Sequence, residues 1–441
     1  MLFDTFLTIK DVMHVIFEIT IYVNIAVIVF TNLMYLNQYI HGIIGVLTKR
    51  KVWPDAKANH KYAYIIACRN EEKVIGHLID SIYKQDYPKE LMQVIVVADN
   101  CSDNTAIISK NHGAIVFERF DDVNIGKSYA LQFVFNKIME DNTFDDIEAF
   151  IIFDADNLVN AKFTKEMNKL YDANVKVATS FRDSKNYNSS WLAAGQSMSF
   201  YREHLLIHHS RSRLNIGTYV SGTGFLVDRN IIKEFGGWNF HTLIEDIEFS
   251  IACGLKDIKI GYCEDAIFYD EQPVKLKTSM TQRLRWCKGV LQCFNKYLIP
   301  SLKKLFKKPT LTSLGLLLHV TPTHVVSFVW TIIYLLLNLV FALTGVITMD
   351  NYVNSVLTGF IFFVINIAAF FISHALFCEI RYGKKIKAPW YKQVLYVLTF
   401  PIFMVLYLPI LFVAIFKDIK WEPINRTIIK SIDEIEKNGT E

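Results

Sequence analysis

Two aspartates, Asp154 and Asp156, stand at the end of the apolar run "AFIIFDAD" (149–156). At the end of a strand, this spacing would bring both carboxylates to one point, as Mg²⁺ or Mn²⁺ requires of its oxygen ligands. A divalent cation held there would bridge a diphosphate and stabilise it as a leaving group. The alternative is that an acidic pair simply ends a strand and caps the next helix. Similar polar clusters after other strands favour the metal site.

A second acidic pair, Glu245 and Asp246, lies in "TLIEDIEFS" (242–250), where the following residues have helical spacing. A carboxylate in a cleft is able to act as a general base if it reaches the proton that it removes. A carboxylate in the first turn of a helix is also stabilised by the helix dipole without any catalytic role. This stretch alone leaves both interpretations open.

The stretch "QRLRWCKG" (282–289) places two arginines and a tryptophan within four residues. Two guanidinium groups suit an anion such as phosphate, to which they make strong charge-assisted hydrogen bonds. The flat indole suits a flat partner such as a sugar ring. The alternative is a packing role near lipid, where arginine and tryptophan are common.

The elements that must position these residues alternate along the chain between apolar strands and amphipathic helices. This alternation predicts a largely parallel sheet that is covered on both faces, with ligands bound beyond the carboxyl ends of its strands. Polar clusters follow three of the strands, and this pattern suggests a nucleotide crevice. The predicted strands are 62–68, 93–99 and 149–156, the helices are 72–85 and 126–140, and the clusters are "RNEE" (69–72), "DNCSDN" (99–104) and "DADN" (154–157).

Two glycine-containing motifs fail as phosphate-binding or dinucleotide-binding sites. "NIGKSYAL" (124–131) holds the GKS of a phosphate-binding loop, but the first glycine of that motif would fall at Asp121. "SGTGFLV" (221–227) lacks the strand–turn–helix setting of a dinucleotide site. The seven cysteines show no CxxC pair and no spacing suited to zinc, which is typical of reduced cytosolic thiols. An ATPase and a dehydrogenase are both disfavoured.

Long uncharged stretches flank this segment and predict a membrane protein with one water-soluble domain, since each is long enough to cross or enter a bilayer. The first stretch is too long for a cleaved signal peptide and is expected to be a retained anchor. The stretches without Asp, Glu, Lys or Arg are 19–48, 310–349, 351–378 and 393–416.

Positive clusters next to these stretches predict that the soluble domain faces the cytosol, at the plasma membrane. With a formal net charge of only +4, the basic residues suit anionic lipid head groups better than nucleic acid. The clusters are 49–51, 303–308, 381–387 and 417–430.

The membrane part is expected to contain interfacial as well as crossing segments. Residues 289–308 have apolar residues at helical spacing between lysines and should lie in the interface. Two crossings follow, near 322–347 and 353–378. Residues 390–417 carry Pro401 and Pro409 and are predicted to form a broken interfacial or re-entrant segment, with a fourth crossing as the alternative. The resulting division is an anchor (1–50), a catalytic domain (51–288), interfacial helices (289–320), helices forming a translocation path (321–419) and a cytosolic loop and tail (420–441).

The set "DAD", "IED" and "QRLRW", in this order and followed by membrane segments, resembles the processive family 2 glycosyltransferases, the relatives of cellulose, hyaluronan and chitin synthases. Their signature runs D, DxD, [TG]ED, QxxRW, and the resemblance covers roughly residues 60–300. It implies a GT-A (Rossmann-like) α/β fold, a UDP-sugar donor and Mg²⁺ or Mn²⁺. Two departures are Ile244, where relatives carry Thr or Gly, and Ala98, where many carry Asp.

The resemblance also implies roles for individual residues. Asp246 would be the base that deprotonates the acceptor hydroxyl, with Glu245 beside it, and Asp156 would coordinate the metal. The nucleotide-sugar would be bound by Ala67, Arg69, Glu71, Asp99, Lys127, Asp154, Gln282, Arg283 and Arg285. The acceptor would be held by Gly222, Thr223 and Trp286. Because "WEPINR" (421–426) resembles a cytosolic gating loop of hyaluronan-synthase relatives, Trp421 and Arg426 would close over UDP.

We therefore expect an inverting enzyme that turns an α-linked UDP-sugar into a β-linked polysaccharide and exports it, with glucose favoured over N-acetylglucosamine. Its partners would be the donor, the nascent polysaccharide and membrane lipids, but no nucleic acid; accessory subunits are left open. One alternative is a non-processive transferase that adds a single sugar to a membrane lipid. Another is a transporter with a regulatory nucleotide-binding domain, which the few membrane segments and Asp246 disfavour.

Overall fold

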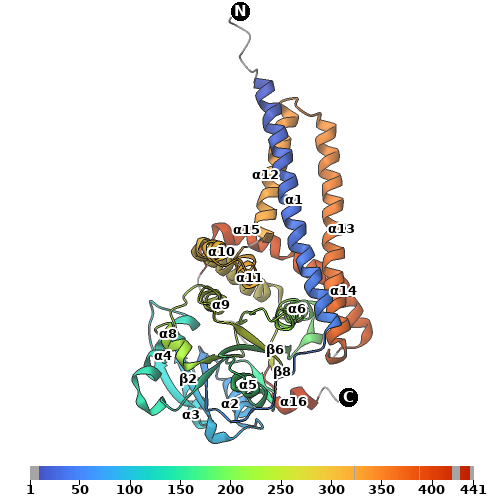
Figure 1. The fold of residues 1–441 in the computed structure, drawn as a ribbon. Coiled ribbons are helices and arrows are strands. Elements are labelled where there is room, and N and C mark those ends of the chain that lie inside the picture. The colour runs from blue at the N-terminus through green and yellow to red at the C-terminus, as the bar shows by residue number, and fades with distance from the viewer. Residues whose placement is uncertain (1–8, 322, 387, 420–427, 438–441) are drawn as a thin grey trace, which may run out of the picture.

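A mixed sheet of eight strands forms the centre of the large domain (Figure 1). The computed structural model describes residues 9–321, 323–386, 388–419 and 428–437. The strand order is β3-β2-β1-β4-β7-β6-β8-β5. The strands are β1 (Tyr62–Cys68), β2 (Met92–Asp99), β3 (Ile115–Arg119), β4 (Ala149–Asp154), β5 (Leu158–Val159), β6 (Val177–Ser184), β7 (Phe225–Asp228) and β8 (Ile260–Asp270).

The first half of the sheet is parallel, as the sequence predicts. Strand β1 pairs in parallel with β2 on one side and with β4 on the other, and β2 pairs in parallel with β3. The three strands predicted from the sequence and the two helices between them are confirmed. The helices of this domain are α2 (Ile75–Tyr83), α3 (Thr105–Asn111), α4 (Lys127–Glu140), α5 (Phe163–Asp172), α8 (Arg229–Glu234) and α9 (Glu245–Leu255).

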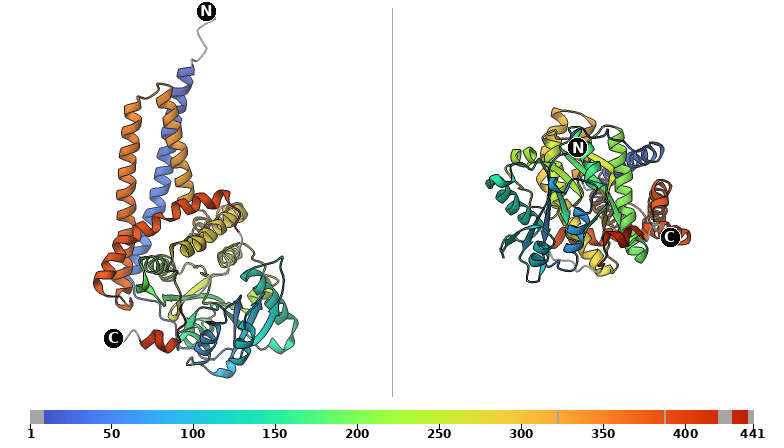
Figure 2. Two further views of the ribbon diagram at one scale, coloured as in Figure 1. Left: turned by 180° about the vertical axis from the view of Figure 1, so that it is seen from behind. Right: turned by 90° about the horizontal axis from the view of Figure 1, so that it is seen from below.

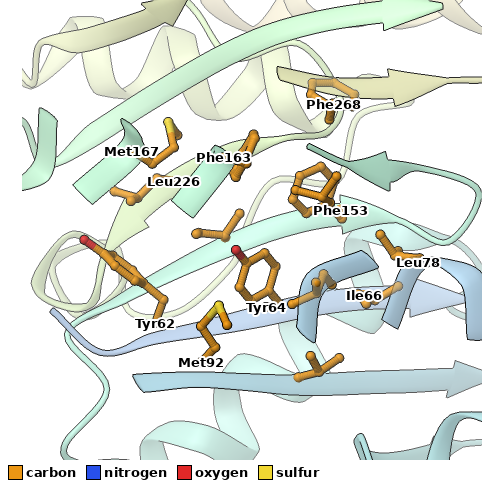
Figure 3. Close-up of a cluster of buried hydrophobic side chains, with 14 of the residues drawn as sticks. Tyr62, Tyr64, Ile66, Leu78, Met92, Phe153, Phe163, Met167, Leu226 and Phe268 are labelled. Atoms are coloured by element: carbon orange, nitrogen blue, oxygen red, sulfur yellow. The ribbon is translucent and has the colours of Figure 1, made fainter. Parts of the chain in front are cut away.

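Both faces of this sheet are buried, which explains why its strands are apolar runs rather than alternating ones. On one face the aromatic rings of Tyr64, Phe153 and Phe163 pack with Met92 and Phe268 (Figure 3). The opposite face is covered by a second cluster that contains Phe135, Phe150, Trp238 and Phe249. The carboxyl ends of β1, β2 and β4 are therefore held rigidly at one edge.

The second half of the sheet departs from the parallel pattern. Strand β7 is antiparallel to both β4 and β6, while β6 and β8 run parallel to each other. Beyond β6, the chain forms α6 (Trp191–Glu203), one turn of π-helix (His204–His209) and α7 (Ser210–Arg213). Helix α6 packs against α13 and α14, so it joins the sheet domain to the membrane part.

Three long apolar helices stand side by side on one side of the domain (Figure 1). They are α1 (Ile9–Leu47), α12 (Thr323–Leu343) and α13 (Met349–Tyr382), and the last two correspond to the two predicted crossings. By length and composition, four segments of the described chain are able to cross a membrane, and the fourth is Trp390–Phe416.

The fourth apolar segment takes a different course from the other three. It breaks at Leu406 into α14 (Trp390–Val405) and α15 (Tyr407–Phe416). These helices run across the base of the three-helix bundle, α14 against α6 and α13, and α15 against α10 (Figure 2). The predicted break in this segment is present, and whether the segment lies in the interface or crosses the membrane stays a prediction.

Helix α10 (Leu276–Lys307) continues without interruption from the "QRLRW" stretch into the amphipathic stretch. The predicted domain boundary between residues 288 and 289 therefore falls inside one helix. A second short helix, α11 (Leu311–Val320), packs against α10. Both lie on the side of the domain that faces the bundle (Figure 1).

The last described helix, α16 (Ile432–Lys437), returns from the membrane part to the sheet. Its Ile432 and Ile435 pack with Leu158 and Tyr269 at the β5–β8 edge. The Lys84 ammonium lies 2.7 Å from the Asp433 carboxylate. The chain thus contacts the sheet domain again after its long apolar helices.

Candidate active site

A cavity of about 380 Å³ lies beyond the carboxyl ends of β1 and β4, at the edge where sequence analysis places the ligand. A volume of this size is typical of small-molecule sites. Eleven of the predicted site residues line it: Ala67, Arg69, Glu71, Lys127, Asp154, Gly222, Glu245, Asp246, Gln282, Arg285 and Trp286. The fold therefore brings together residues that are more than 200 positions apart in the sequence.

Asp99 is a predicted nucleotide contact that does not line this cavity. It ends β2, is 4% exposed, and its carboxylate Oδ1 accepts a hydrogen bond from Arg119 Nη1 at 2.5 Å. Burial raises the pKa of Asp99, while the Arg119 guanidinium opposes that rise. Arg119, which ends β3, was not singled out in the sequence because nothing local marks it as the partner of Asp99.

Lys127 connects three parts of the site. Its Nζ lies 2.5 Å from Asp154 Oδ1, 2.6 Å from the Gly222 carbonyl oxygen and 3.9 Å from Glu245 Oε1. Burial disfavours the charged ammonium, but Asp154, Glu245 and Asp246 outweigh this effect and raise the pKa of Lys127. Lys127 is therefore a fixed positive charge between the two acidic pairs.

Glu245 and Asp246 occupy the first turn of α9, and both carboxylates face the cavity. Asp246 Oδ2 accepts a hydrogen bond from the Gly222 amide at 2.5 Å. Gly222 has φ of 70°, a conformation that favours glycine, and a Cβ there would lie 3.2 Å from Arg182 Nη2. The glycine thus allows the backbone to approach Asp246 closely.

Both carboxylates of this pair are harder to ionise than usual. Burial raises the pKa of Glu245 to about 7, with Asp246 adding to the rise and Lys127 opposing it. Burial also raises the pKa of Asp246, against the hydrogen bonds from the backbone and the charge of Lys127. A carboxylate with a raised pKa is a stronger base, and this property suits proton abstraction near neutral pH.

The "QRLRW" stretch presents only some of its side chains to the cavity. Gln282, Arg285 and Trp286 lie at helical spacing on one face of α10 and line it. Arg283 is fully buried on another face, where it donates to the Phe403 carbonyl oxygen at 3.1 Å and to Ser279 Oγ at 3.0 Å. The prediction that Arg283 faces the leaving group is therefore wrong. Arg283 and Arg285 are two positions apart on one helix, so their side chains point about 200° apart and only Arg285 faces the cavity.

Two further predicted contacts are buried beside the cavity and do not line it. Thr223 is 2% exposed, and its Oγ1 accepts from the Asp154 amide and donates to Asn157 Oδ1. Asp156 is 1% exposed. The strand ends at Asp154, and Ala155 and Asp156 form a turn, so the strand alternation that would align the two aspartates does not extend to Asp156.

These positions bear on where a metal would bind. The described ranges contain no group of three or more His, Cys, Asp or Glu side chains that could hold a metal ion. Asp154 lines the cavity and its side chain is 37% exposed, whereas Asp156 is buried. Asp154 therefore fits as a protein ligand of a cation that a substrate diphosphate would also hold, and the assignment of Asp156 as a metal ligand stays a prediction.

Sequence reasoning missed a stripe of α6 residues that lines the cavity. Gln196, Ser199, Phe200 and Glu203 are spaced three and four apart, so they share one helix face. The Phe200 ring makes an edge contact with Trp286, with centroids 6.2 Å apart. The helical spacing was visible in the sequence, but nothing showed that this face meets a cavity rather than the core.

Arg182 is a second missed residue of the cavity wall. Its guanidinium lies 4.2 Å from the Phe200 ring centroid and donates to the Ser221 carbonyl oxygen. Glu203 lies 3.1 Å from His208 Nε2; burial would raise the pKa of Glu203, but His208 and Arg182 lower it. An ionised carboxylate of α6 therefore borders the cavity. The predicted contacts Trp421 and Arg426 lie outside the described residues.

A sheet with this cavity, its acidic pairs and its "QRLRW" helix is typical of a nucleotide-sugar-dependent transferase of GT-A fold. The family model described as "Glycosyltransferase like family 2" matches residues 59–289. This match covers more than half of the chain, and the chain belongs to this family of glycosyltransferases.

Relatives with known or assigned activities differ in their acceptors. The chain is 27% identical over 353 residues to a poly-β-1,6-N-acetyl-D-glucosamine synthase of Staphylococcus epidermidis, covering 76% of this chain and 80% of that protein. It is 26% identical over 265 residues to the probable glycosyltransferase YdaM of Bacillus subtilis, and spans 56% of that protein. A β-monoglucosyldiacylglycerol synthase of Synechocystis is 26% identical over 241 residues, 53% of this chain and 48% of that protein.

Among solved structures, the mannosyltransferase PcManGT from Pyrobaculum calidifontis, in complex with GDP-Man and Mn²⁺, is similar in fold. The TM-score is 0.56 at 15% identity, over 88% of this chain and 97% of that one. At this identity the likeness shows the fold alone. It confirms the GT-A fold that was expected from the sequence, and the apolar helices are seen in the described part of this chain.

Proposed function

We propose that this protein is an inverting glycosyltransferase that extends a β-linked glycan from a UDP-sugar at a membrane and exports the product. The observation that supports this most is the position of Asp246. Its carboxylate accepts a hydrogen bond from the amide of Gly222, the residue whose carbonyl oxygen accepts from Lys127, and it lines the same cavity as Asp154 and the α6 stripe. We assign the Lys127–Asp154 part of the cavity to the donor and the α6 stripe to the acceptor.

In the proposed reaction, the acceptor hydroxyl lies beside Asp246 and the donor diphosphate beside Lys127. Asp246 takes the hydroxyl proton as the oxygen attacks the anomeric carbon, and the bond from that carbon to the diphosphate oxygen breaks. The nucleoside diphosphate leaves with the bonding electron pair, and Lys127 and Arg285 balance its charge. A divalent cation held by Asp154 and the diphosphate would neutralise further negative charge. A single displacement inverts the anomeric configuration.

The acceptor half of the cavity supports a sugar chain as the acceptor. The α6 stripe offers an amide, a hydroxyl and a carboxylate, and Trp286 adds a flat face for a sugar ring. Aromatic faces beside polar groups suit a carbohydrate, which has apolar faces and hydroxyl edges. For the donor, the sequence alone favoured glucose, but a relative that covers 76% of this chain is a synthase of an N-acetylglucosamine polymer. We therefore propose UDP-N-acetylglucosamine first and UDP-glucose second.

The direct test is purified full-length protein in detergent with Mn²⁺ or Mg²⁺, given each UDP-sugar in turn. UDP release together with a high-molecular-weight product from one donor would establish the proposal and identify the sugar. A chelator in excess should stop the reaction, and added Mn²⁺ should restore it. Turnover of no donor, with or without metal, would contradict the proposal.

A second candidate is transfer of one sugar to a membrane lipid. Tyr407 of α15, which belongs to an apolar segment able to enter a membrane, also lines the cavity. The similarity to a β-monoglucosyldiacylglycerol synthase points the same way. In the same assay, this function gives UDP release with a small product that is soluble in organic solvent and no polymer.

The two arginines of "QRLRW" should respond differently to replacement by methionine. Arg283→Met removes buried hydrogen bonds and ring contacts at 4.3 Å and 4.9 Å, so the apparent Tm should fall while the donor KM stays unchanged. Arg285→Met should leave Tm unchanged and lower kcat/KM for the donor by about tenfold or more, because it removes a charge facing the phosphates. Thermal melting and steady-state kinetics on both variants check this. A raised donor KM in Arg283→Met at unchanged Tm would contradict it.

Gln196 should contact the acceptor. Its Oε1 atom is buried and has no hydrogen-bond partner in the described part of the chain, although Gln196 lines the cavity. Gln196→Met should raise the KM for an added oligosaccharide acceptor by about fivefold to tenfold, the value of one hydrogen bond, with the donor KM unchanged. Gln132→Met, on the surface of α4, is the matched control. If Gln196 only fills space, Gln196→Met would raise Tm and leave the acceptor KM unchanged.

A further inference from the structure

A second cavity, of about 230 Å³, lies away from the candidate active site, where the chain leaves α1 and passes the start of β8. Its walls combine basic, aromatic and small polar side chains. Among the lining residues are Lys51, Trp53, Ser212, Asn215, Thr218 and Lys259. None of these residues has a role in the proposed transfer reaction.

This cavity holds an excess of positive charge. Lys51 Nζ lies 4.0 Å from the Trp53 ring centroid, and the Lys259 ammonium donates to Asn215 Oδ1. Burial lowers the pKa of Lys51, and the neighbouring charges of Lys259 and Arg213 lower it further. In the part of the chain that the structure describes, none of these three cations has an ion-pair partner. An anion in the cavity would offset their mutual repulsion.

The cavity also lies next to the end of a membrane-spanning candidate. Helix α1 ends at Leu47, four residues before Lys51. The last turns of α1 are fixed to the same segment that forms the cavity wall: His41 Nδ1 lies 2.7 Å from Ser210 Oγ, and Thr48 Oγ1 lies 3.0 Å from His209 Nε2. If α1 spans the bilayer, the cavity lies at the level of the lipid head groups.

We propose that this cavity binds a phosphate group with net negative charge. Two ammonium groups supply charge-assisted hydrogen bonds to phosphate oxygens, and the neighbouring hydroxyl and amide groups supply neutral ones. The phosphate belongs either to an anionic phospholipid, whose acyl chains would lie along α1, or to a soluble phosphate ester. Its position next to α1 favours the lipid, because basic residues beside membrane helices attract anionic head groups. The inference is independent of the proposed transferase function.

The test measures binding to the purified full-length protein in a neutral detergent by titration calorimetry. The probes are short-chain phosphatidylglycerol, phosphatidylcholine with the same acyl chains, and glycerol 3-phosphate. The variant Lys51→Gln/Lys259→Gln is compared with Lys110→Gln/Lys137→Gln, which removes two lysines from the surface of the first half of the sheet domain. Gel filtration and apparent Tm show that each variant is folded.

We expect phosphatidylglycerol to bind at least tenfold more weakly to the cavity variant than to the wild type, and equally well to the control variant. Glycerol 3-phosphate that binds as tightly as the lipid, with the same dependence on Lys51 and Lys259, would support the site and identify a soluble source. Three results would overturn the proposal. They are an equal loss of binding in both variants, binding of phosphatidylcholine as tight as that of phosphatidylglycerol, and no binding of any probe.

Discussion

The Asp246→Asn variant is expected to lose sugar transfer by about 10²- to 10⁴-fold while it still binds the donor, because the substitution removes a proton acceptor and little else. The asparagine side chain is able to keep the hydrogen bond that Asp246 Oδ2 accepts from the Gly222 amide. The loop around Gly222 should therefore stay in place. Steady-state rates with each donor, together with donor binding by titration, separate the lost chemistry from lost binding.

The pH dependence of the wild type and of Glu245→Gln provides the control. Asp246 has to be ionised to accept a proton, so activity should rise with pH through the apparent pKa values of the Glu245–Asp246 pair. Burial raises the pKa of both groups, to about 7 for Glu245. The rise in activity with pH, which is the acid limb of the pH–rate profile, should therefore occur at a pH well above the pKa of an ordinary aspartate. Because an ionised carboxylate raises the pKa of its neighbour, Glu245→Gln should lower the pKa of Asp246 and move the acid limb to lower pH. A limb near pH 4 in the wild type, or full activity in Asp246→Asn, would contradict the assignment.

Lys127→Gln is expected to have the second largest effect, a loss of kcat/KM of about 10²-fold or more. The ammonium is the cation that lies against Asp154, the Gly222 carbonyl oxygen and Glu245. Its removal leaves three buried or half-buried carboxylates close together without their compensating charge, and also removes a charge beside the proposed diphosphate position. Donor KM should therefore rise and kcat should fall together.

The sign of a pH shift distinguishes this role from simple misfolding. Lys127 lowers the pKa of both Glu245 and Asp246, so its loss should move the acid limb to higher pH. Lys127→Arg keeps the charge and should keep the limb near its wild-type position, even if the larger side chain slows the reaction. An unchanged pH profile in Lys127→Gln would show that Lys127 does not act on the carboxylate pair.

The parallel half of the fold was predictable because its signals are local. Strands β1, β2 and β4 are continuous apolar runs that end in polar clusters, and a doubly covered parallel sheet requires that pattern. The antiparallel strand β7 pairs with β4 and β6, which are distant in sequence, and no local pattern in "FLVD" (225–228) indicates its direction. Pairing across such distances depends on the whole domain.

The candidate site was predictable as a set of motifs but not in its fine geometry. Asp154, Lys127 and Asp246 reach the cavity as expected, since they follow strand ends or begin helices at the carboxyl edge. Arg283 and Asp156 do not, because one helix position and one turn decide which way a side chain points. The α6 stripe was not predicted, since a helix face that meets a cavity has the same spacing as one that meets the core.

The cluster between the sheet domain and the membrane part has a consequence for dissecting the protein. Phe181, Tyr201 and Tyr262 of the sheet domain share one buried cluster with Tyr382 and Phe400 of α13 and α14. The two parts are thus not separable modules. A truncated fragment without α12–α15 would expose this aromatic surface to water. In a hybrid that takes only these helices from a relative, the side chains on the two sides of the cluster would no longer fit each other. Useful hybrids of these transferases should exchange α6 together with the helices against which it packs.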